Sequence, residues 1–325
     1  MILALRKLGH EAEVINYKNK THQATDAFNP WVYRNPFKLL FSWKKNRAFQ
    51  RAFRKMPMSD FTSNAEQVDW NKYDAILVGS DIVWNYELPS LGHDKVYFGG
   101  LPESYNGKLI SYAPSCGQMQ FDYSVPETVK RSMQRYTSTS ARDANTKKFA
   151  QLHTGHSETP IVVDPTWLTS KDRGLSKLGI KNYILLYTYR IPEEYVPEIK
   201  KFAKERDLEI IGTGYYQSIA DKQFSDADPF EWVDLFTNAS YVIAGTFHAA
   251  LYAMRESVKF AVISQPATDT KLKGPMNITG LHNHIIERAQ DIESILEMEI
   301  DKGEVNAKIA DSRKMSLDYL RDALA

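Results

Sequence analysis

The sequence predicts an α/β protein made of two Rossmann-like domains that face each other across a cleft. Short apolar runs of strand length alternate with helical patterns along most of the chain, which is typical of parallel sheets covered by helices. The alternation stops at a polar segment, residues 168–181, and then starts again. Polar residues gather directly after the apolar runs, at the sheet edge where open α/β sheets bind ligands.

Length and composition agree with this fold class. A chain of 325 residues suggests two domains, and 43% hydrophobic with 25% charged residues is ordinary for a soluble globular protein. The net charge of +1 gives no reason to expect a nucleic acid partner. Cys116 is the single cysteine, so an internal disulfide is excluded and a reducing, cytoplasmic location is expected. No apolar run reaches the roughly 18 residues of a membrane span.

The chain opens with a pattern that belongs to the second element of a doubly wound domain. Residues 1–8 read as the end of an amphipathic helix that stops at Gly9, and residues 13–17 read as a strand. Such a domain should open with a strand and a loop that lead into this helix. We therefore expect the first domain, as given, to lack its opening strand and the chain to begin late.

A basic segment follows. No acidic residue lies between Asp26 and Asp60, and residues 37–55 mix seven basic side chains with large apolar ones. One interpretation is a basic amphipathic helix that makes a peripheral contact with the inner face of a membrane or with an anionic acceptor. The other is a surface helix whose aromatic face packs onto the protein, which is the commoner pattern. The residues concerned are Lys38, Lys44, Lys45, Arg47, Arg51, Arg54, Lys55, Phe37, Leu40, Phe41, Trp43, Phe49 and Phe53.

The rest of the first domain, which we assign to residues 1–168, continues the alternation. Its predicted strands and helices are each followed by a polar turn, as a Rossmann-like domain requires. The predicted strands are residues 73–78, 109–113, 136–140 and 161–163, and the predicted helices are residues 125–135 and 144–152.

The second domain, residues 169–290, repeats the pattern. Asp228 followed by Pro229 predicts the capped start of a helix. Residues 266–283 read as a loop-rich segment, a lid or cleft rim, and residues 285–325 carry two helical patterns without a strand. We take 291–325 as a helical tail that lies back across the first domain. The predicted strands are 183–189, 209–211, 241–244 and 259–263, and the predicted helices include 193–206 and 247–255.

Residues 239–263 form the clearest unit, a strand, a helix and a second strand that predict a right-handed crossover between parallel strands. Gly245 and Thr246 separate the first strand from the helix, and His248 lies in the first helical turn. The backbone N–H groups of Gly245 and Thr246 are candidates to hold phosphate oxygens. The alternative is a plain tight turn.

Several motifs in this order resemble those of the polysaccharide pyruvyl transferase family. The resemblance runs from residue 5 to about residue 263, and its specificity lies in the order and spacing of the motifs. The motifs are Val78-Gly-Ser-Asp81 with Trp84, Ser111-Tyr-Ala-Pro-Ser115 with Gly117, Ser140-Ala-Arg-Asp143, Val163-Asp-Pro-Thr166 and Thr246-Phe-His248.

The resemblance implies a fold like that of the two-domain, B-type glycosyltransferases, with the first domain on the acceptor side. It also implies phosphoenolpyruvate as the donor, with no other cofactor, and a pair of sugar hydroxyls as the acceptor. The product would be a pyruvate ketal on a cell-surface glycan or on its precursor, free or lipid-linked. Two departures stand out: the family's opening strand with its Asn-Tyr-Gly loop is absent, and its Ser-Phe-His-Gly reads Thr246-Phe-His-Ala249.

His248 is the candidate catalytic residue. Ketal formation from an enol ether needs a proton delivered to carbon and a base for the hydroxyl proton, and an imidazole can do both near neutral pH. The alternative is a first-turn histidine that only packs or caps.

Arg142 is our first choice for donor binding, because a guanidinium fork suits either the carboxylate or the phosphate of phosphoenolpyruvate. The alternatives for Arg142 are an ion pair with Asp143 or an ordinary surface position. Arg190, which follows a predicted strand, is a second and weaker candidate for an anion ligand.

Asp81, Trp84 and Tyr215 complete the candidate binding residues. Asp81 would orient a hydroxyl or a basic partner, with turn capping as the alternative. Trp84 and Tyr215 would stack against a sugar, although aromatic side chains more often lie in the core. Asp164 precedes a proline and is expected to fix a turn.

No metal site is expected. His282 and His284 lie two residues apart in a predicted loop without further ligands. Cys116 has no evident catalytic partner, so we expect a small buried cysteine. Gly212-Thr-Gly214 is an incomplete dinucleotide fingerprint, which argues against a nicotinamide or flavin enzyme.

Two rival functions stay open. The first is a B-type glycosyltransferase that uses a nucleotide sugar, because fold does not determine function. The second domain shows no clear glutamate motif for base and ribose contacts, which disfavours this rival. The second is a non-catalytic glycan-binding relative, which the absent opening strand would permit.

Overall fold

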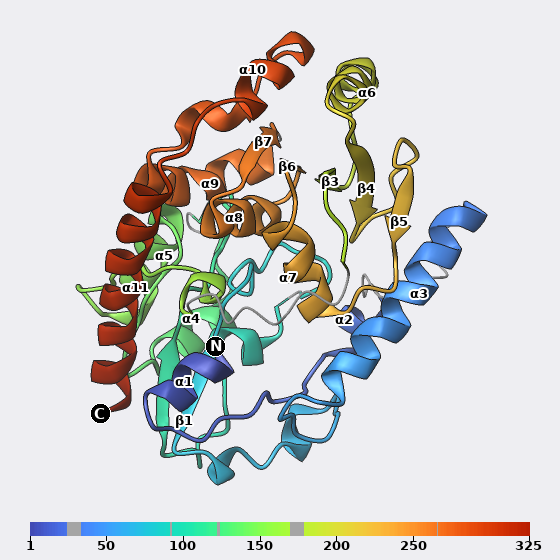
Figure 1. The fold of residues 1–325 in the computed structure, drawn as a ribbon. Helices are drawn as coiled ribbons and strands as arrows, with labels where there is room; N and C mark the ends of the chain where they lie inside the picture. The colour runs from blue at the N-terminus through green and yellow to red at the C-terminus, as the bar shows by residue number, and fades with distance from the viewer. Residues whose placement is uncertain (25–33, 92, 122–123, 170–178, 265) are drawn as a thin grey trace. The chain divides into compact units, whose positions relative to one another are not determined.

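The computed structural model describes residues 1–24, 34–91, 93–121, 124–169, 179–264 and 266–325, and Figure 1 shows the chain as a ribbon. The chain forms two compact units. The first unit comprises Met1–Asp26, Pro57–Thr169 and Asp311–Ala325, and the second unit comprises Ala27–Met56 and Ser170–Ala310.

Helices and short parallel strands alternate in both units. The α-helices are α1 (Ile2–Lys7), α2 (Lys20–Ala24), α3 (Pro36–Phe53), α4 (Glu127–Met133), α5 (Ala144–Thr154), α6 (Val196–Glu205), α7 (Pro229–Thr237), α8 (Phe247–Glu256), α9 (Pro266–Thr279), α10 (Ile292–Leu296) and α11 (Lys302–Leu324). The strands are β1 (Ala75–Val78), β2 (Lys108–Ser111), β3 (Tyr183–Tyr187), β4 (Glu209–Thr213), β5 (Lys222–Phe224), β6 (Tyr241–Ala244), β7 (Lys259–Ile263) and β8 (Ile285–Ile286). Short 3-10 helices lie at Ala65–Gln67, Trp70–Lys72, Lys95–Phe98, Pro165–Trp167, Glu193–Tyr195, His282–His284 and Ala289–Asp291.

The second unit is built on a six-stranded sheet with the order β5-β4-β3-β6-β7-β8, in which all neighbouring strands run parallel. The chain enters at β3, builds outward to β5, and returns to pair β6 with β3 before building in the opposite direction. The strand order therefore reverses between β3 and β6, as in a Rossmann fold. The predicted α/β fold with parallel sheets is confirmed, and β5 and β8 are short strands that the sequence analysis missed.

The crossover from β6 through α8 to β7 follows the sequence prediction. The Thr246 hydroxyl caps α8 by accepting a hydrogen bond from the Ala249 N–H at 3.2 Å, as its position before the helical pattern indicates. Ala250, Leu251 and Met254 are buried on one face of the helix. Because these apolar residues recur at helical spacing, α8 is held against the sheet and His248 is held at its carboxyl edge.

The prediction of a loop-rich segment at residues 266–283 is wrong, because most of it is helix α9. The breakers Gly274 and Pro275 lie inside this helix and favour a loop in a sequence reading, since an interior proline costs about 3 kcal/mol. Leu272 and Met276 are buried one helical turn apart, and α9 packs on α8. Tertiary burial therefore outweighs the local preference for a loop.

Helix α3 groups with the second unit, although sequence order would place it in the first domain, 1–168. The Phe37 and Phe41 rings lie 6.2 and 6.4 Å from the Tyr216 ring, between β4 and β5. The Lys45 ammonium donates to the Gly214 carbonyl oxygen at 3.1 Å. Figure 1 shows α3 on the side of the sheet where β5 lies. Aromatic packing far along the chain, rather than sequence proximity, decides where this helix belongs.

The first unit contains the parallel pair β1-β2. The strands predicted at residues 13–17, 136–140 and 161–163 appear only as isolated bridges, because few of their backbone groups pair in register. All of these bridges are parallel, so the first unit is also of α/β type. They join Val14 to Met58, Tyr17 to Thr62, Ile110 to Ser138 and Ala141 to Ile161.

The end of α11, from Asp311 onward, belongs to the first unit, whereas its start belongs to the second unit. The Ser316 hydroxyl accepts from the Val163 N–H at 3.0 Å, and the Tyr319 hydroxyl donates to the Ser111 carbonyl at 2.8 Å. The Arg313 side chain donates to the Trp167 carbonyl at 2.6 Å. These bonds satisfy backbone groups at the edge of a short sheet and so anchor the tail.

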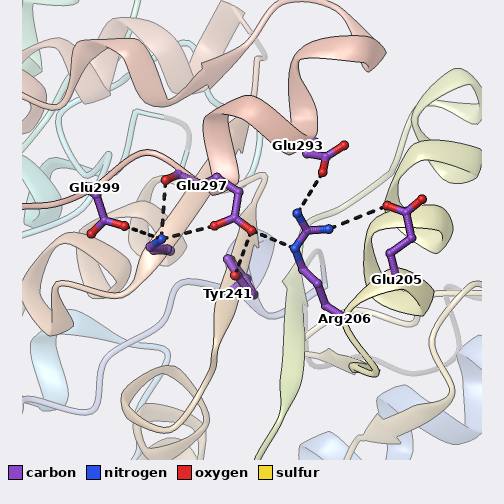
Figure 2. A network of polar contacts seen from close by, with 7 residues as sticks. Glu205, Arg206, Tyr241, Glu293, Glu297 and Glu299 are labelled. Carbon is purple, nitrogen blue, oxygen red and sulfur yellow. Dashed lines mark hydrogen bonds and ion pairs between the residues drawn. The ribbon is translucent and has the colours of Figure 1, made fainter.

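A polar network lies at the amino-terminal edge of the second unit's sheet, the edge away from His248 (Figure 2). Glu297 accepts hydrogen bonds from Arg206 at 2.7 Å, Lys259 at 3.2 Å and Tyr241 at 3.1 Å. Burial alone would raise the pKa of the Glu297 carboxyl, but the hydrogen bonds from Arg206, Lys259 and Tyr241 outweigh it and lower that pKa below its ordinary value. Because the three donors come from different elements, Glu297 ties α6, β6 and β7 to α10.

We predict that Glu297→Gln lowers the free energy of unfolding of the protein by about 1 kcal/mol at pH 7, the upper end for a partly exposed ion pair. A lowered folded-state pKa stabilises the protein above the ordinary carboxyl value of 4.5, and this stabilisation is lost as the pH falls through the folded-state pKa. The difference between wild type and variant, measured by urea unfolding from pH 7 down to pH 4, should therefore shrink toward acid.

Glu299→Gln is the matched control. Glu299 contacts the same Lys259 ammonium at 2.7 Å but is largely exposed, so its loss should change stability little. An equal effect of both substitutions, or a pH-independent effect of Glu297→Gln, would contradict the assigned role.

Candidate functional site

The carboxyl edge of the second unit's sheet collects the loops that follow β3, β4 and β6. Gly245 follows β6, and a Cβ placed there would lie 1.8 Å from the Thr188 hydroxyl oxygen and 2.4 Å from the Thr188 Cβ. Only glycine therefore allows the loop after β3 to lie directly against the start of α8. This close approach occurs where the strand order reverses, which is the ligand-binding position in open α/β sheets.

The Gly245 N–H is already used within the sheet, which corrects the expectation that it binds phosphate. It donates to the Tyr187 carbonyl oxygen at 2.9 Å. Thr246 is buried, and its hydroxyl caps α8. The tight-turn alternative therefore describes Gly245, whereas phosphate binding by the Thr246 N–H stays a prediction.

His248 is partly exposed in the first turn of α8. Its ring contacts the Phe247 ring at a centroid distance of 5.4 Å, and the two planes cross at 74°. The imidazole is therefore not sealed in the interior, and it lies at the sheet edge that the sequence predicted for it.

Cationic and aromatic side chains lie at the same edge. Arg190 follows β3 and is exposed, and the Thr188 hydroxyl donates to its carbonyl at 2.9 Å. The Tyr215 ring packs 4.3 Å from the exposed Tyr189 ring, and the Lys45 ammonium lies 5.2 Å from the Tyr215 ring centre. Burial raises the pKa of the Tyr215 phenol, so it stays protonated and can donate a hydrogen bond.

The sequence analysis did not predict that Lys45 and Tyr189 lie at the carboxyl edge of the second unit's sheet. Lys45 lies in α3, more than a hundred residues before β4, and no local spacing links the two. Tyr189 could have been found from its position directly after β3, next to the predicted Arg190.

Three of the strand ends of the first unit meet at Arg142. Its guanidinium is 5% exposed and donates to the Ser80 carbonyl at 3.1 Å and to the Asp164 carboxylate at 3.2 Å. A second guanidinium nitrogen lies 3.8 Å from the Asp81 carboxylate. The three turns predicted from separate motifs are thus joined by one side chain.

The ion pair of Arg142 is made with Asp164 and not with Asp143. Asp143 instead caps α5 by accepting from the Thr146 N–H at 2.8 Å, and it accepts from the Ser115 hydroxyl at 2.7 Å. Asp164 accepts from the Thr166 N–H at 3.0 Å, so it fixes the expected turn while also pairing with the arginine. A capping carboxylate cannot be told from an ion-pairing one by sequence position alone.

Asp81 remains accessible. Its side chain is 69% exposed, and its carboxylate accepts from the Ile82 N–H at 2.8 Å. It therefore caps a turn, as the alternative interpretation held, while lying near Arg142. The neighbouring Gly79 has a positive φ of 143°, and a Cβ there would lie 2.0 Å from the Tyr112 carbonyl oxygen.

The expectation that Trp84 stacks against a sugar is corrected by its burial. Trp84 is 0% exposed and packs edge-on against Tyr136, with ring centres 5.4 Å apart. It belongs to the core of the first unit together with Phe98 and Phe149. Its position after a strand led to the prediction, but the turn directs the indole inward.

Cys116, His282 and His284 are the remaining residues that the sequence analysis considered. Burial raises the pKa of the Cys116 thiol to about 12, which leaves it protonated and unreactive. His284 is buried with its Nδ1 2.9 Å from the Phe260 carbonyl oxygen, whereas His282 is exposed. Within the described residues, no group of three or more His, Cys, Asp or Glu side chains is arranged to hold a metal ion.

Comparisons with solved structures return distant similarities. The UDP-GlcNAc 2-epimerase of Methanocaldococcus jannaschii is 15% identical over 95% of this chain and 93% of that chain, with a TM-score of 0.47. The UDP-N-acetylglucosamine 2-epimerase of Rickettsia bellii is 14% identical over 98% and 92%, with a TM-score of 0.45. A glycosyltransferase of Streptomyces nogalater is 12% identical over 98% and 89%, with a TM-score of 0.39. A comparison with curated proteins found no match.

The family comparison is more informative. The model of the polysaccharide pyruvyl transferase family matches residues 1–265. This range includes the strand ends around Arg142 in the first unit and His248 in the second. The resemblance inferred from the motifs is thus confirmed, and the chain belongs to the polysaccharide pyruvyl transferase family.

Proposed function

We propose that this protein transfers the pyruvyl group of phosphoenolpyruvate to two hydroxyls of one sugar, forming a pyruvate ketal on a cell-surface glycan or its precursor. Family membership supports the transferase class. The observation that carries the proposal is the partly exposed His248 imidazole at the edge where the strand order reverses, in the same unit as the exposed Arg190. We propose a cytoplasmic location for this reaction.

The reaction balances with a single group that moves protons. A proton added to the methylene carbon of phosphoenolpyruvate makes a methyl group and leaves a cationic carbon that the first hydroxyl attacks. The second hydroxyl then replaces phosphate at this carbon. Of the two hydroxyl protons, one balances the new methyl hydrogen and the other leaves with phosphate. We assign both transfers to His248, because an imidazole has one ring nitrogen that can donate a proton and one that can accept a proton.

The donor carries a carboxylate and a phosphate, so cations must hold it. We assign Arg190 to this role because it is exposed on the loop that lies against the start of α8. Arg142, the first choice from the sequence, stays a prediction as a donor ligand. In the first unit its guanidinium is fixed by Ser80 and Asp164, and Asp81 is the accessible carboxylate beside it. Tyr189 and Tyr215 are the proposed platform for the sugar ring.

The first prediction concerns turnover. His248→Ala should lower the rate of pyruvyl transfer by about 10²- to 10⁴-fold, the usual contribution of a general acid or base. Its affinity for phosphoenolpyruvate, measured by calorimetry, should stay close to that of the wild type, because the proposed cations are unchanged.

His282→Ala is the control for this experiment, since His282 is an exposed histidine of the same unit. It should keep full turnover. Wild-type turnover in His248→Ala would remove His248 from the mechanism.

The second prediction concerns the donor. A saturating concentration of phosphoenolpyruvate should raise the melting temperature of the protein by several degrees, because a ligand that binds only the folded state stabilises it. Uridine diphosphate should not do so. Arg190→Gln should lose most of this shift, since a charged hydrogen bond contributes about 1.5–3 kcal/mol.

Arg288→Gln is the matched control, because Arg288 is also an exposed arginine of the second unit and pairs with Asp291. It should keep the full shift. A shift with uridine diphosphate alone would favour the nucleotide-sugar glycosyltransferase, and a shift with phosphoenolpyruvate without turnover on any glycan would favour a non-catalytic relative.

A further inference from the structure

Helix α3 has one face that packs on the second unit. Phe41, Ala48 and Ala52 are buried at helical spacing, and Phe41 contacts Tyr216. The Asn35 side chain caps the helix by accepting from the Phe37 N–H at 2.9 Å. This packing agrees with the inward-facing interpretation of the sequence, but it accounts for only part of the apolar residues.

The opposite face carries large apolar side chains that stay in solvent. Leu40 is 53% exposed and Trp43 is 46% exposed. Leu40 and Trp43 are three residues apart, so they lie side by side on the helix surface. Two large apolar groups next to each other on a solvent face indicate a surface that contacts another apolar medium.

Basic side chains lie on the same face of α3, closer to its C-terminal end. Lys44, Arg47 and Arg51 are exposed and follow Leu40 by 4, 7 and 11 residues, which is the spacing of one helix face. The Arg47 guanidinium lies 4.7 Å from the Trp43 ring centre. Since no acidic residue occurs between Asp26 and Asp60, nothing within this segment offsets these charges.

We propose that the outward face of α3, formed by Leu40, Trp43, Lys44, Arg47 and Arg51, docks on an anionic membrane surface. A helix of this kind lies in the interface plane, with tryptophan and leucine at the boundary between headgroups and acyl chains and with cations at the lipid phosphates. A soluble anionic polymer would satisfy the cations but would leave Leu40 in water. The charge and the apolar pair together therefore favour the membrane.

The contact is peripheral. None of the helices in the described parts of the chain combines the length and the apolar character that crossing a bilayer requires. The docking face lies on the second unit, which also carries His248 and Arg190. It would keep this unit at the surface from which a lipid-linked acceptor is reached, but the binding itself is independent of pyruvyl transfer.

Flotation with lipid vesicles tests the proposal without any substrate. The full chain should bind vesicles of phosphatidylcholine with about 30% phosphatidylglycerol and should bind pure phosphatidylcholine vesicles much more weakly. Binding should fall when salt rises from about 0.05 M to about 0.5 M, because the ions screen the charges. Equal binding to both vesicle types would overturn the proposal.

Two variants separate the contributions. Lys44→Gln/Arg47→Gln/Arg51→Gln should lower the apparent affinity for the anionic vesicles at least tenfold, given the strong attraction of each cation to an anionic leaflet. Leu40→Ser/Trp43→Ser should also weaken binding, and the remaining binding should be abolished by salt. Both sets of positions are exposed, so circular dichroism and melting should show an intact fold.

The matched control removes the same charge elsewhere. Lys200, Lys201 and Lys204 are exposed on α6 of the same unit, and Lys200→Gln/Lys201→Gln/Lys204→Gln should bind as the wild type does. Equal losses in both triple variants would indicate net charge alone and would overturn the docking face. Retention by an anionic polysaccharide column without vesicle binding would overturn it as well.

Discussion

The close approach of Gly245 to Thr188 is the constraint on which the candidate site of the second unit depends. The missing side chain lets the loop after β3 lie against the first turn of α8, and the Gly245 N–H continues the pairing between β3 and β6. Two neighbouring strands then deliver His248 and the loop that carries Arg190 to one sheet edge. A methyl group at residue 245 would push these loops apart, so the position of His248 relative to the loop after β3 depends on glycine at residue 245.

The two edges of the second unit's sheet differ in how their charged side chains are paired and exposed. At the amino-terminal edge, the Glu297 carboxylate accepts hydrogen bonds from Arg206, Lys259 and Tyr241, and these bonds lower its pKa. At the carboxyl edge, Arg190 and His248 remain exposed or partly exposed. In the first unit, Arg142 joins three turns and lies beside the accessible Asp81.

Sequence reasoning succeeded where the signal was local. The alternation of apolar runs with helical patterns predicted the α/β fold, and the segment around Thr246 and His248 predicted the crossover and the cap. The family followed from the order and spacing of several motifs. It was least accurate where strands are short, because the first unit's outer strands form only single bridges. It also missed α9, since Gly274 and Pro275 favour a loop unless burial on a neighbouring helix compensates for them.

The sequence by itself determined the class of fold, the family and the place of His248 at a strand end, because these follow from the order of residues along one segment. Only the tertiary structure decided that α3 joins the second unit, that Trp84 is buried, and that Arg142 pairs with Asp164 instead of Asp143. Each of these depends on contacts between residues separated by many positions. Local spacing carries no information about such contacts, since the same side chain can cap, pair or pack according to what the rest of the chain brings beside it.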